Sequence, residues 1–494
     1  MRYTKLKSLE RLRAQTVKPV SCGLSNDEVE FFAERDPLLD QAICSAIERI
    51  EELQIEFPEL TKLDESELLE VLRDGFLSFY PEETSSPYVP LTAKGPWVIT
   101  FGGAVIYDTG GYGMLGHGHN PDCIREAMAE PQVMANIMTP SFSRHRFVNK
   151  IRNHVGRNHS SKKCPFDKFV FMNSGSEGMG VALRISDSHA KRITDPGARH
   201  EGKSIKALSF LGSFHGRTYR AARISSSTRK KYDAALASFR DHSDHIEVRC
   251  NDAAHLRELF EKLEGENSYV ECIALEPVMG EGNPGSPLER EFYDVARELT
   301  TKHESFLIID SIQAGLRAHG VLSLIDYPGY GDCLPPDIEI YSKALNGGQY
   351  PLSVVAMQQW VADQYVSGTY GNTMTASPRA LDIASTVLNA CSPELEKNIQ
   401  TKGKEFVERL KSVQQELGGV ITKVQGTGLL VSAELREDIA VVGHDAVEQR
   451  LRKTGVNVIH GGKNSLRYTP WFLVSSEEID LIVRKTKEVL LEFS

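Results

Sequence analysis

The chain has 494 residues, of which 40% are hydrophobic and 25% are charged. Such length and composition are typical of a globular protein with two or three domains and large cores. The net charge of −10 argues against an electrostatic nucleic-acid binder, and the basic clusters in the sequence are short and scattered. The sequence contains no run of about 18 apolar residues, so we expect no membrane span.

The eight cysteines include no Cys-x-x-Cys pair and show no spacing typical of a disulfide framework or a zinc site. We therefore expect free thiols and a reducing compartment. Residues 1–10 contain basic side chains with no continuous apolar stretch behind them, which is unlike a secretory signal. These observations predict a cytoplasmic protein.

Two helices are predicted near the amino terminus. The first begins behind Asp36 and Pro37, an acid suited to cap a helix and a proline suited to its first position. The second begins at Asp64, which forms a capping pair with Glu67. Each has an apolar face, which we expect to pack against the rest of the chain or a dimer partner. These faces contain Leu39, Ile43, Ile47, Ile50 and Leu53, and then Leu68, Leu69, Leu72 and Phe76.

Short apolar runs then predict strands. Residues 97–101 and 104–108 flank Gly102-Gly103, a pattern that favours a hairpin. From about residue 150 to 380, strand runs alternate with helical stretches, which is typical of a doubly wound sheet with its ligand at the carboxyl ends of the strands. The expected strands are 169–172, 207–210, 272–275, 306–309, 338–341 and 353–356. A capping box at Ser475 and Glu478 opens the expected last helix.

Lys343 is the most informative residue, because it stands between the apolar strand 338–341 and Gly347-Gly348. A lysine at a strand end in a closed site can lose solvation, and its lowered pKa then suits it to Schiff-base formation. About 33 residues earlier, the buried strand 306–309 delivers Asp310 at its carboxyl end. Taken alone, Asp310 also fits an acid that caps the next loop.

A third pattern predicts an anion site. Residues 173–177 read Asn-Ser-Gly-Ser-Glu and connect the strand 169–172 to a helical run at 178–192. Free N–H groups at the helix start, the helix dipole and the Ser176 hydroxyl could together hold a phosphate. Taken alone, the same residues also fit an ordinary helix cap.

These motifs and their order resemble the class III (ornithine/4-aminobutyrate-type) aminotransferases of pyridoxal-phosphate fold type I. The resemblance covers roughly residues 90–494, and besides Lys343 it is carried by seven segments. They are 115–121 (Leu-Gly-His-Gly-His-Asn-Pro), 173–177, 213–218 (Ser-Phe-His-Gly-Arg-Thr), 276–280 (Glu-Pro-Val-Met-Gly), 310–315 (Asp-Ser-Ile-Gln-Ala-Gly), 370–378, and the pair 426–430 and 466–470.

The resemblance implies an α/β fold with a mostly parallel, doubly wound central sheet and a smaller α+β domain. It also implies a division of the chain into four parts. These are a helical extension at 1–88, a segment at 89–150 that contributes to the small domain and the site entry, a large cofactor-binding domain at 151–380, and a small carboxyl-terminal domain at 381–494.

The resemblance further implies pyridoxal 5′-phosphate as cofactor, with Lys343 as the Schiff-base lysine and Asp310 as the partner of the ring nitrogen. Ser174, Gly175 and Ser176 would bind the phosphate. Phe214 would stack on the ring, with His215 and Glu276 nearby, and Gln313 would bond near the phenolic oxygen. Thr373 would reach the phosphate of the neighbouring subunit, which implies a homodimer with shared sites. Arg317 or Arg467 would bind a substrate carboxylate.

Three segments depart from the family pattern. Ser311 stands where most members carry Glu directly after the pyridine-binding Asp. Arg317 lies one residue earlier than in ornithine or 4-aminobutyrate aminotransferases, as it does in the glutamate-semialdehyde aminomutase branch. Residues 375–377 (Thr-Ala-Ser) replace a Gly-Gly-Asn run, which makes that loop stiffer.

The sequence therefore predicts a pyridoxal-phosphate-dependent aminotransferase that moves an amino group from an ω-amine or amino acid to a 2-oxo acid. An aminomutase, racemase or decarboxylase of the same fold is the first alternative, since all four reactions begin with the same Schiff base. An alternative of another class is a non-catalytic interaction protein that has kept the fold and binds through its amino-terminal helices.

Overall fold

The computed structural model describes residues 2–15 and 19–493. Met1 belongs to the amino-terminal segment discussed above as unlike a secretory signal, and it lies outside the described residues. The chain forms two compact units. We call Met1–Asp122, Thr401–Gln425 and Val431–Ser494 the terminal unit, and Cys123–Gln400 with Gly426–Leu430 the central unit. The four-part division expected from the sequence stays a prediction.

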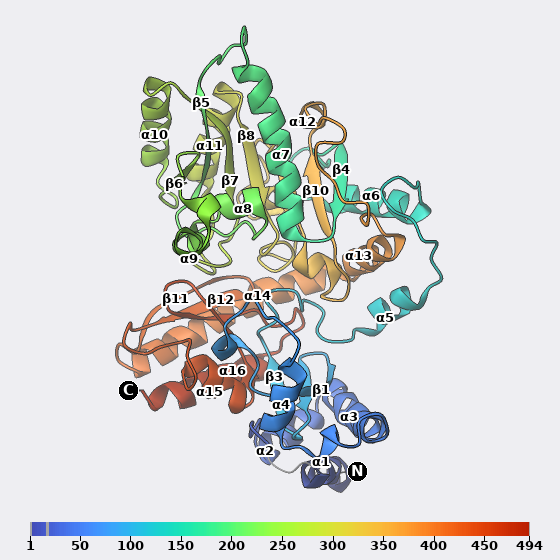
Figure 1. Cartoon of the computed structure of the whole chain (residues 1–494). Helices are drawn as coiled ribbons and strands as arrows, with labels where there is room; N and C mark the ends of the chain where they lie inside the picture. The colour runs from blue at the N-terminus through green and yellow to red at the C-terminus, as the bar shows by residue number, and fades with distance from the viewer. Residues whose placement is uncertain (1, 16–18, 494) are drawn as a thin grey trace. The chain divides into compact units, whose positions relative to one another are not determined.

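The central unit is built on a seven-stranded sheet of order β4-β10-β9-β8-β7-β5-β6 (Figure 1). Strand β10 runs antiparallel to both neighbours, and the other neighbouring pairs are parallel. This arrangement confirms the predicted mostly parallel sheet. Its strands are β4 (Lys168–Met172), β5 (Ser204–Phe210), β6 (His245–Val248), β7 (Ser268–Leu275), β8 (Phe306–Asp310), β9 (Ile338–Tyr341) and β10 (Ser353–Met357).

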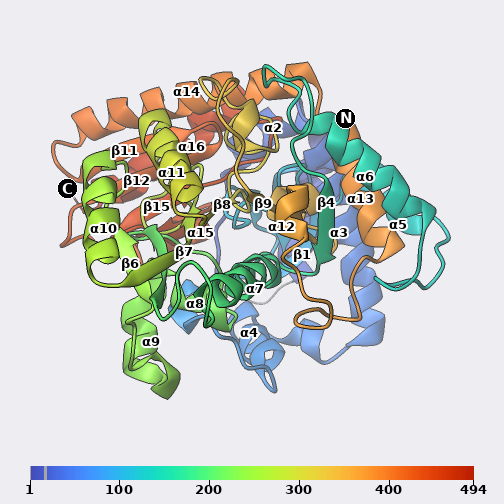
Figure 2. The ribbon, with the colours of Figure 1, turned by 90° about the horizontal axis from the view of Figure 1, so that it is seen from above.

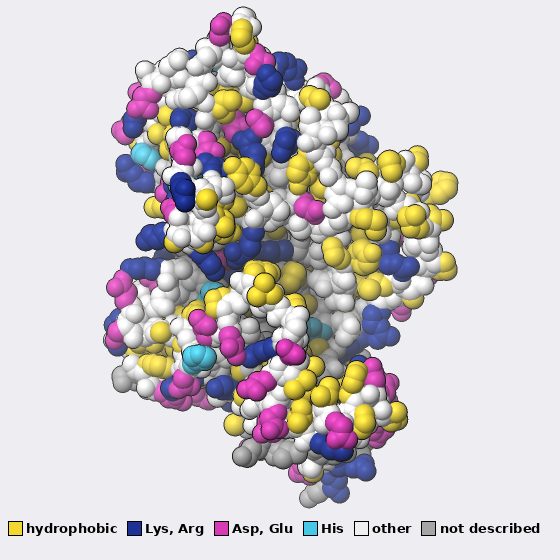
Figure 3. All heavy atoms as spheres, viewed as in Figure 1, with side chains coloured by type: hydrophobic (Ala, Val, Ile, Leu, Met, Phe, Trp, Pro, Cys, Tyr) yellow, Lys and Arg dark blue, Asp and Glu magenta, His cyan; other side chains and the backbone are white. Residues whose placement is uncertain are grey.

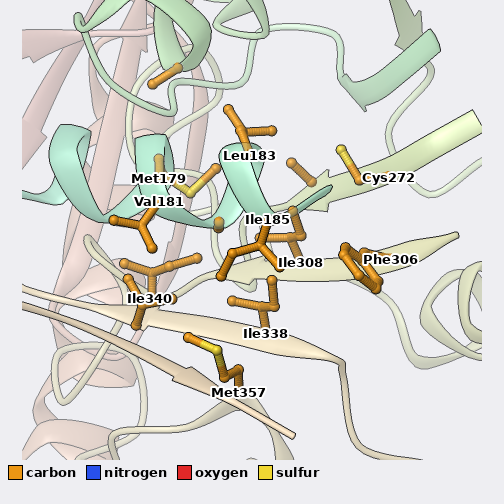
Figure 4. Close-up of a cluster of buried hydrophobic side chains, with 14 of the residues drawn as sticks. Met179, Val181, Leu183, Ile185, Cys272, Phe306, Ile308, Ile338, Ile340 and Met357 are labelled. Carbon is orange, nitrogen blue, oxygen red and sulfur yellow. The ribbon is translucent and has the colours of Figure 1, made fainter. Parts of the chain in front are cut away.

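Helices cover both faces of this sheet. Figure 2 shows α7 (Gly175–Thr194) on one side and α10 (Ala253–Gly265) and α11 (Arg290–Lys302) on the other. Beneath α7, the side chains of Met179, Leu183 and Ile185 pack against Ile308 and neighbouring strand residues (Figure 4). Each such side chain contributes about 1.5–3 kcal/mol on full burial. The core therefore fixes α7, and with it the turn between β4 and α7.

Shorter helices complete the central unit. They are α6 (Phe142–His154), α8 (Tyr219–Arg223), α9 (Arg229–Ala235), α12 (Gln359–Ala362) and α13 (Pro378–Ala390). Helix α5 (Asp122–Ala129) begins at the last residue of a terminal-unit segment, and α14 (Pro393–Glu416) has residues in both units.

The terminal unit contains two four-stranded sheets. One has the order β1-β2-β3-β13 and includes the predicted hairpin as β2 and β3. The other has the order β11-β12-β15-β14. Their strands are β1 (Pro90–Lys94), β2 (Trp97–Thr100), β3 (Val105–Asp108), β11 (Ile421–Thr427), β12 (Leu430–Leu435), β13 (Val456–Asn457), β14 (Ile459–Gly461) and β15 (Ser465–Tyr468). Helices α15 (Val447–Lys453) and α16 (Ser476–Leu491) complete it, and α16 opens with the predicted Ser475 and Glu478 capping box.

Four helices form the amino-terminal part of this unit: α1 (Arg2–Gln15), α2 (Asn26–Ala33), α3 (Pro37–Glu56) and α4 (Glu65–Arg73). The sequence predicted α3 and α4 with their Asp36 and Asp64 caps, and missed α1 and α2. On α3 the apolar stripe is buried at Leu39, Ile43 and Ile50 and half-buried at its other two residues. Beyond Leu68 the stripe of α4 opens to solvent, with Leu72 53% and Phe76 73% exposed. These two residues do not pack within the described part of the chain, so for them the expected contact with a dimer partner stays a prediction. Among the described helices, none is long and apolar enough to cross a membrane.

Candidate active site

Lys343 lies just past the carboxyl end of β9, in a single helical turn, Lys343–Asn346, that closes at Gly347. Its own φ is +48°, in the left-handed region that side chains other than glycine rarely adopt. Such backbone strain costs about 1–3 kcal/mol and clusters at functional sites, because only the surrounding structure maintains it. The side chain is half-buried, and its Nζ donates a hydrogen bond to Oε1 of Gln313.

Asp310, the last residue of β8, lies beside His215. Its Oδ2 is 2.8 Å from Nδ1 of His215, and its Oδ1 accepts a hydrogen bond of 3.1 Å from the Ile312 N–H. Both side chains are almost completely buried. The opposite nitrogen of His215, Nε2, has no hydrogen-bond partner among the described residues. A buried carboxylate held at two oxygens is a rigid acceptor for a cationic N–H.

The predicted anion site falls at the start of α7, and the helix begins at Gly175 rather than at residue 178. Ser174 caps it, and Glu177 completes a capping box with Ser174. The hydroxyl of Ser176 accepts a hydrogen bond from the Arg217 N–H at 2.9 Å, which joins the helix start to the 213–218 turn. A negative group at this end would be stabilised by the dipole of a 20-residue helix.

Gly216 is required for this close approach. Its φ is +125°, and a Cβ atom at this position would collide with Ser176. A side chain at Gly175 would meet Cδ1 of Ile312 at 2.7 Å. The two glycines therefore bring the turn, the helix start and the segment after β8 into contact.

Glu276 follows β7 and ties two turns together. Its carboxylate accepts hydrogen bonds from the Phe214 N–H at 3.0 Å and from the Gly280 N–H at 2.8 Å. Burial is the largest influence on this group and raises the pKa of Glu276 to about 7. The Phe214 ring is half-buried, and the Arg217 guanidinium lies 5.4 Å from its centroid.

Replacing Glu276 with glutamine is expected to change how stability depends on pH. The pKa of about 7 in the folded state lies above the value of about 4.3 for an exposed glutamate, so folding strengthens proton binding. This contribution to stability is fully present below the unfolded pKa and is lost as the pH rises through about 7. Glutamine does not titrate, so the stability of Glu276→Gln relative to the unchanged protein should rise between pH 5 and pH 8.

Urea unfolding of the cofactor-free protein at both pH values measures that difference. In the variant, the amide NH₂ can face a backbone N–H, which costs stability. That cost is the same at pH 5 and pH 8, so it cancels when the two pH values are compared. Glu258→Gln, at an exposed position, provides the control. The stability of this variant relative to the unchanged protein should be the same at both pH values. A pH-independent result for Glu276→Gln would contradict the prediction.

Most of the site residues predicted from the sequence lie together in the central unit. Hydrogen bonds link Lys343 to Gln313, Asp310 to His215, and Glu276 to the turn of Phe214. The amide Nε2 of Gln313 is buried and has no hydrogen-bond partner among the described residues.

The remaining three predicted residues are not joined to this group by the hydrogen bonds just described, and two of them, Thr373 and Arg317, also belong to the central unit. Thr373 is exposed, next to Asn372, whose amide donates a hydrogen bond of 3.1 Å to Glu177. Arg317 is fully buried, donates to the Leu429 carbonyl at 3.2 Å, and has its pKa lowered to about 9 by burial. Arg467 belongs to the terminal unit, on β15.

Two buried residues near the site were missed by the sequence analysis. The Ser225 hydroxyl accepts a hydrogen bond from the His215 N–H at 2.9 Å and so fixes the backbone of that histidine. Glu339 lies on β9 and is fully buried. A charged residue inside the apolar run Ile-Glu-Ile-Tyr was the feature that could have revealed Glu339.

Comparison with known proteins agrees with this geometry. The sequence profile of the family Aminotransferase class-III matches residues 79–490. The ornithine aminotransferase of Staphylococcus epidermidis (strain ATCC 12228) is 28% identical over 415 residues, which cover 81% of this chain and 95% of that protein. The acetylornithine aminotransferase of Clostridium acetobutylicum is 30% identical over 323 residues, which cover 65% of this chain and 76% of that protein.

A solved structure gives the same result for the fold. The crystal structure of the ornithine aminotransferase from Toxoplasma gondii ME49 matches with a TM-score of 0.74 and 22% sequence identity. The match covers 89% of this chain and 98% of that one. The resemblance inferred from the motifs is therefore confirmed, and the chain belongs to the class III aminotransferase family.

Proposed function

We propose that this protein is a pyridoxal-phosphate-dependent aminotransferase that moves an amino group from an ω-amine or amino acid to a 2-oxo acid. The observation that carries the proposal is the pairing of Lys343 with Gln313 and of Asp310 with His215, at the carboxyl ends of β9 and β8. Ligands of doubly wound sheets bind at this edge.

The residues at this edge fit the cofactor. The start of α7, with Ser174, Gly175 and Ser176, is suited to its phosphate because backbone N–H groups and the helix dipole converge there. The buried Asp310 carboxylate is suited to the protonated ring nitrogen. The partnerless Nε2 of Gln313 is a donor for the phenolic oxygen. Bound pyridoxal phosphate supplies an electron sink for the substrate's carbon atom.

Each protein group then has a defined task. Lys343 would hold the cofactor through its Nζ, and the same amine would accept the proton that leaves the substrate carbon. Asp310 would accept a hydrogen bond from the ring nitrogen, and His215 fixes the direction of that carboxylate. Phe214 offers a ring face for stacking, and Glu276 anchors its backbone.

The test is a screen of amino donors with the purified protein. Relatives are named as ornithine and acetylornithine aminotransferases, so these two amines are the first donors to try, with 2-oxoglutarate as acceptor. We expect an amine to bleach the visible absorption of the protein while an equal amount of carbonyl product appears. An isomerised amine formed without consumption of 2-oxoglutarate would indicate an aminomutase instead.

We also infer a homodimer with shared sites. Apolar side chains gather around the segment before α6, where Figure 3 shows a group of yellow side chains. Met134 and Phe142 are each 88% exposed, and Met374, next to Thr373, is 73% exposed. Exposed apolar patches of this kind typically mark protein interfaces.

The proposed location is the cytoplasm, because all eight cysteines are free thiols.

Replacing the arginine that binds the substrate carboxylate is expected to raise KM for an amino acid donor about 10-fold or more, with kcat little changed. A charge-assisted bond present in both the ground and the transition state gives this pattern. Comparing Arg317→Ala with Arg467→Ala by steady-state kinetics identifies the residue. A donor amine without a carboxylate provides the control, since its KM should not respond. If neither variant changes KM, neither arginine binds the carboxylate.

A further inference from the structure

Glu339 is a buried carboxylate for which the proposed reaction has so far given no use. It lies in the middle of β9, between two core isoleucines, and is 0% exposed. Four groups donate hydrogen bonds to it. They are the Ser311 hydroxyl at 2.6 Å, the Leu324 N–H at 2.9 Å, the Tyr341 hydroxyl at 2.9 Å, and the Ser323 hydroxyl.

Three of these four donors come from the two ends of one segment. Residues 311–324 leave β8 directly after Asp310 and include Gln313 and Arg317. The carboxylate of Glu339 holds the segment at its first residue and at its last two. If the segment could move, Gln313 would move away from Lys343. The hydrogen bonds to Glu339 therefore help to maintain the contact between Gln313 and Lys343.

The same carboxylate also acts on the strand that leads to the lysine. Tyr341 lies on β9, two residues before Lys343, and bonds back to Glu339. Strands β8 and β9 pair in parallel, with Asp310 opposite Ile340. Glu339 therefore braces the strand ends that carry Asp310 and Lys343 against the segment that carries Gln313.

The energetic cost of burying Glu339 indicates that this carboxylate has a specific role. Burying a carboxylate costs several kcal/mol unless hydrogen bonds compensate, and an apolar residue in β9 would avoid that cost. The Ser311 hydroxyl donates to this acid on the neighbouring strand, so a carboxylate lies directly beside the Asp310 turn.

Resting on the proposed function, we propose that Glu339 is a positioning residue of this aminotransferase. It fixes Gln313 and Asp310 relative to Lys343 and thereby shapes the place where the cofactor binds.

The test is the affinity of the full chain for pyridoxal phosphate, measured by titrating the cofactor-free protein and following visible absorption. Glu339→Gln keeps the size of the side chain but removes its charge and turns an NH₂ group toward donors. We expect binding about 10- to 100-fold weaker and a shifted absorption maximum. Ser311→Ala removes one donor, and we expect about 2- to 10-fold weaker binding. Thermal unfolding of the cofactor-free variants shows separately how much the fold is affected.

Glu271→Gln is the matched control. Glu271 is also a buried glutamate, bonded to Ser186 and Arg220, and burial raises its pKa to about 7, as it does the pKa of Glu339. It lies in the middle of β7, next to Cys272, which pairs with Phe306 at the start of β8, whereas Asp310 is the last residue of β8. We expect Glu271→Gln to lower thermal stability while leaving cofactor affinity unchanged.

The outcomes separate the two proposals. If the unchanged protein does not bind the cofactor, the proposed function fails. If it binds and Glu339→Gln binds equally well, the role of Glu339 is refuted. Equal losses of affinity in Glu339→Gln and Glu271→Gln would also refute it, because the effect would then follow from general destabilisation. If Glu339→Gln does not fold, Ser311→Ala decides, and unchanged affinity in that variant overturns the inference.

Discussion

Replacing Lys343 with alanine is expected to remove the visible absorption of the enzyme and to lower turnover by at least about 10²- to 10⁴-fold. The variant loses the amine that binds the cofactor covalently and the group that moves the proton, and proton transfer alone contributes a factor of that size. Absorption spectra before and after borohydride reduction, together with turnover of the best donor, measure both losses.

Two further variants show whether the amine itself is responsible. Lys343→Arg keeps the positive charge but has no amine that forms a Schiff base at neutral pH, so it should be as inactive as the alanine variant. Lys168→Ala removes an exposed lysine at the start of β4 and should behave like the unchanged protein. Visible absorption that persists in Lys343→Ala after dialysis would show that another residue binds the cofactor.

Replacing Asp310 with asparagine is expected to lower kcat by about 10²- to 10³-fold while the cofactor remains bound. The variant keeps the shape of the side chain but replaces the carboxylate proposed to face the ring nitrogen with a neutral amide. Loss of one preorganised electrostatic group in a buried site has an effect of this size. Asparagine also changes the contact with Nδ1 of His215, which lies 2.8 Å from the Asp310 carboxylate.

The half-reaction with an amine, followed by stopped-flow absorption, gives the rate of the chemical step directly. Asp337→Asn is the matched control, since Asp337 is also buried but lies before β9 and pairs with Arg297 at 2.9 Å. Its replacement should lower stability and leave the half-reaction rate unchanged. A half-reaction in Asp310→Asn as fast as in the unchanged protein would remove Asp310 from its assigned role.

The sequence predicted the elements whose patterns are local. Strand runs such as 306–309 and 338–341 were recognisable because buried parallel strands are continuously apolar. The caps at Asp64 and Ser475 were recognisable because a capping box involves residues only three positions apart, and the cap at Asp36 because a proline follows it directly. Strand β6 was missed because its four residues alternate and lie at the edge of the sheet, where burial is incomplete.

By itself, the sequence determined the family and the order of the motifs, and it singled out Lys343 as the candidate lysine, since each depends on neighbouring residues. Only the tertiary structure joined residues far apart in the chain. His215 and Asp310 are 95 positions apart, and their contact arises where the turn after β5 meets the end of β8. Likewise, the four donors around Glu339 come together only when β9 lies beside β8. The exposure of Phe76 also depends on the tertiary structure, because no other part of the described chain packs over most of its side chain. The physical reason is that a local pattern specifies an element, whereas burial and hydrogen-bond partners are properties of the packed elements together.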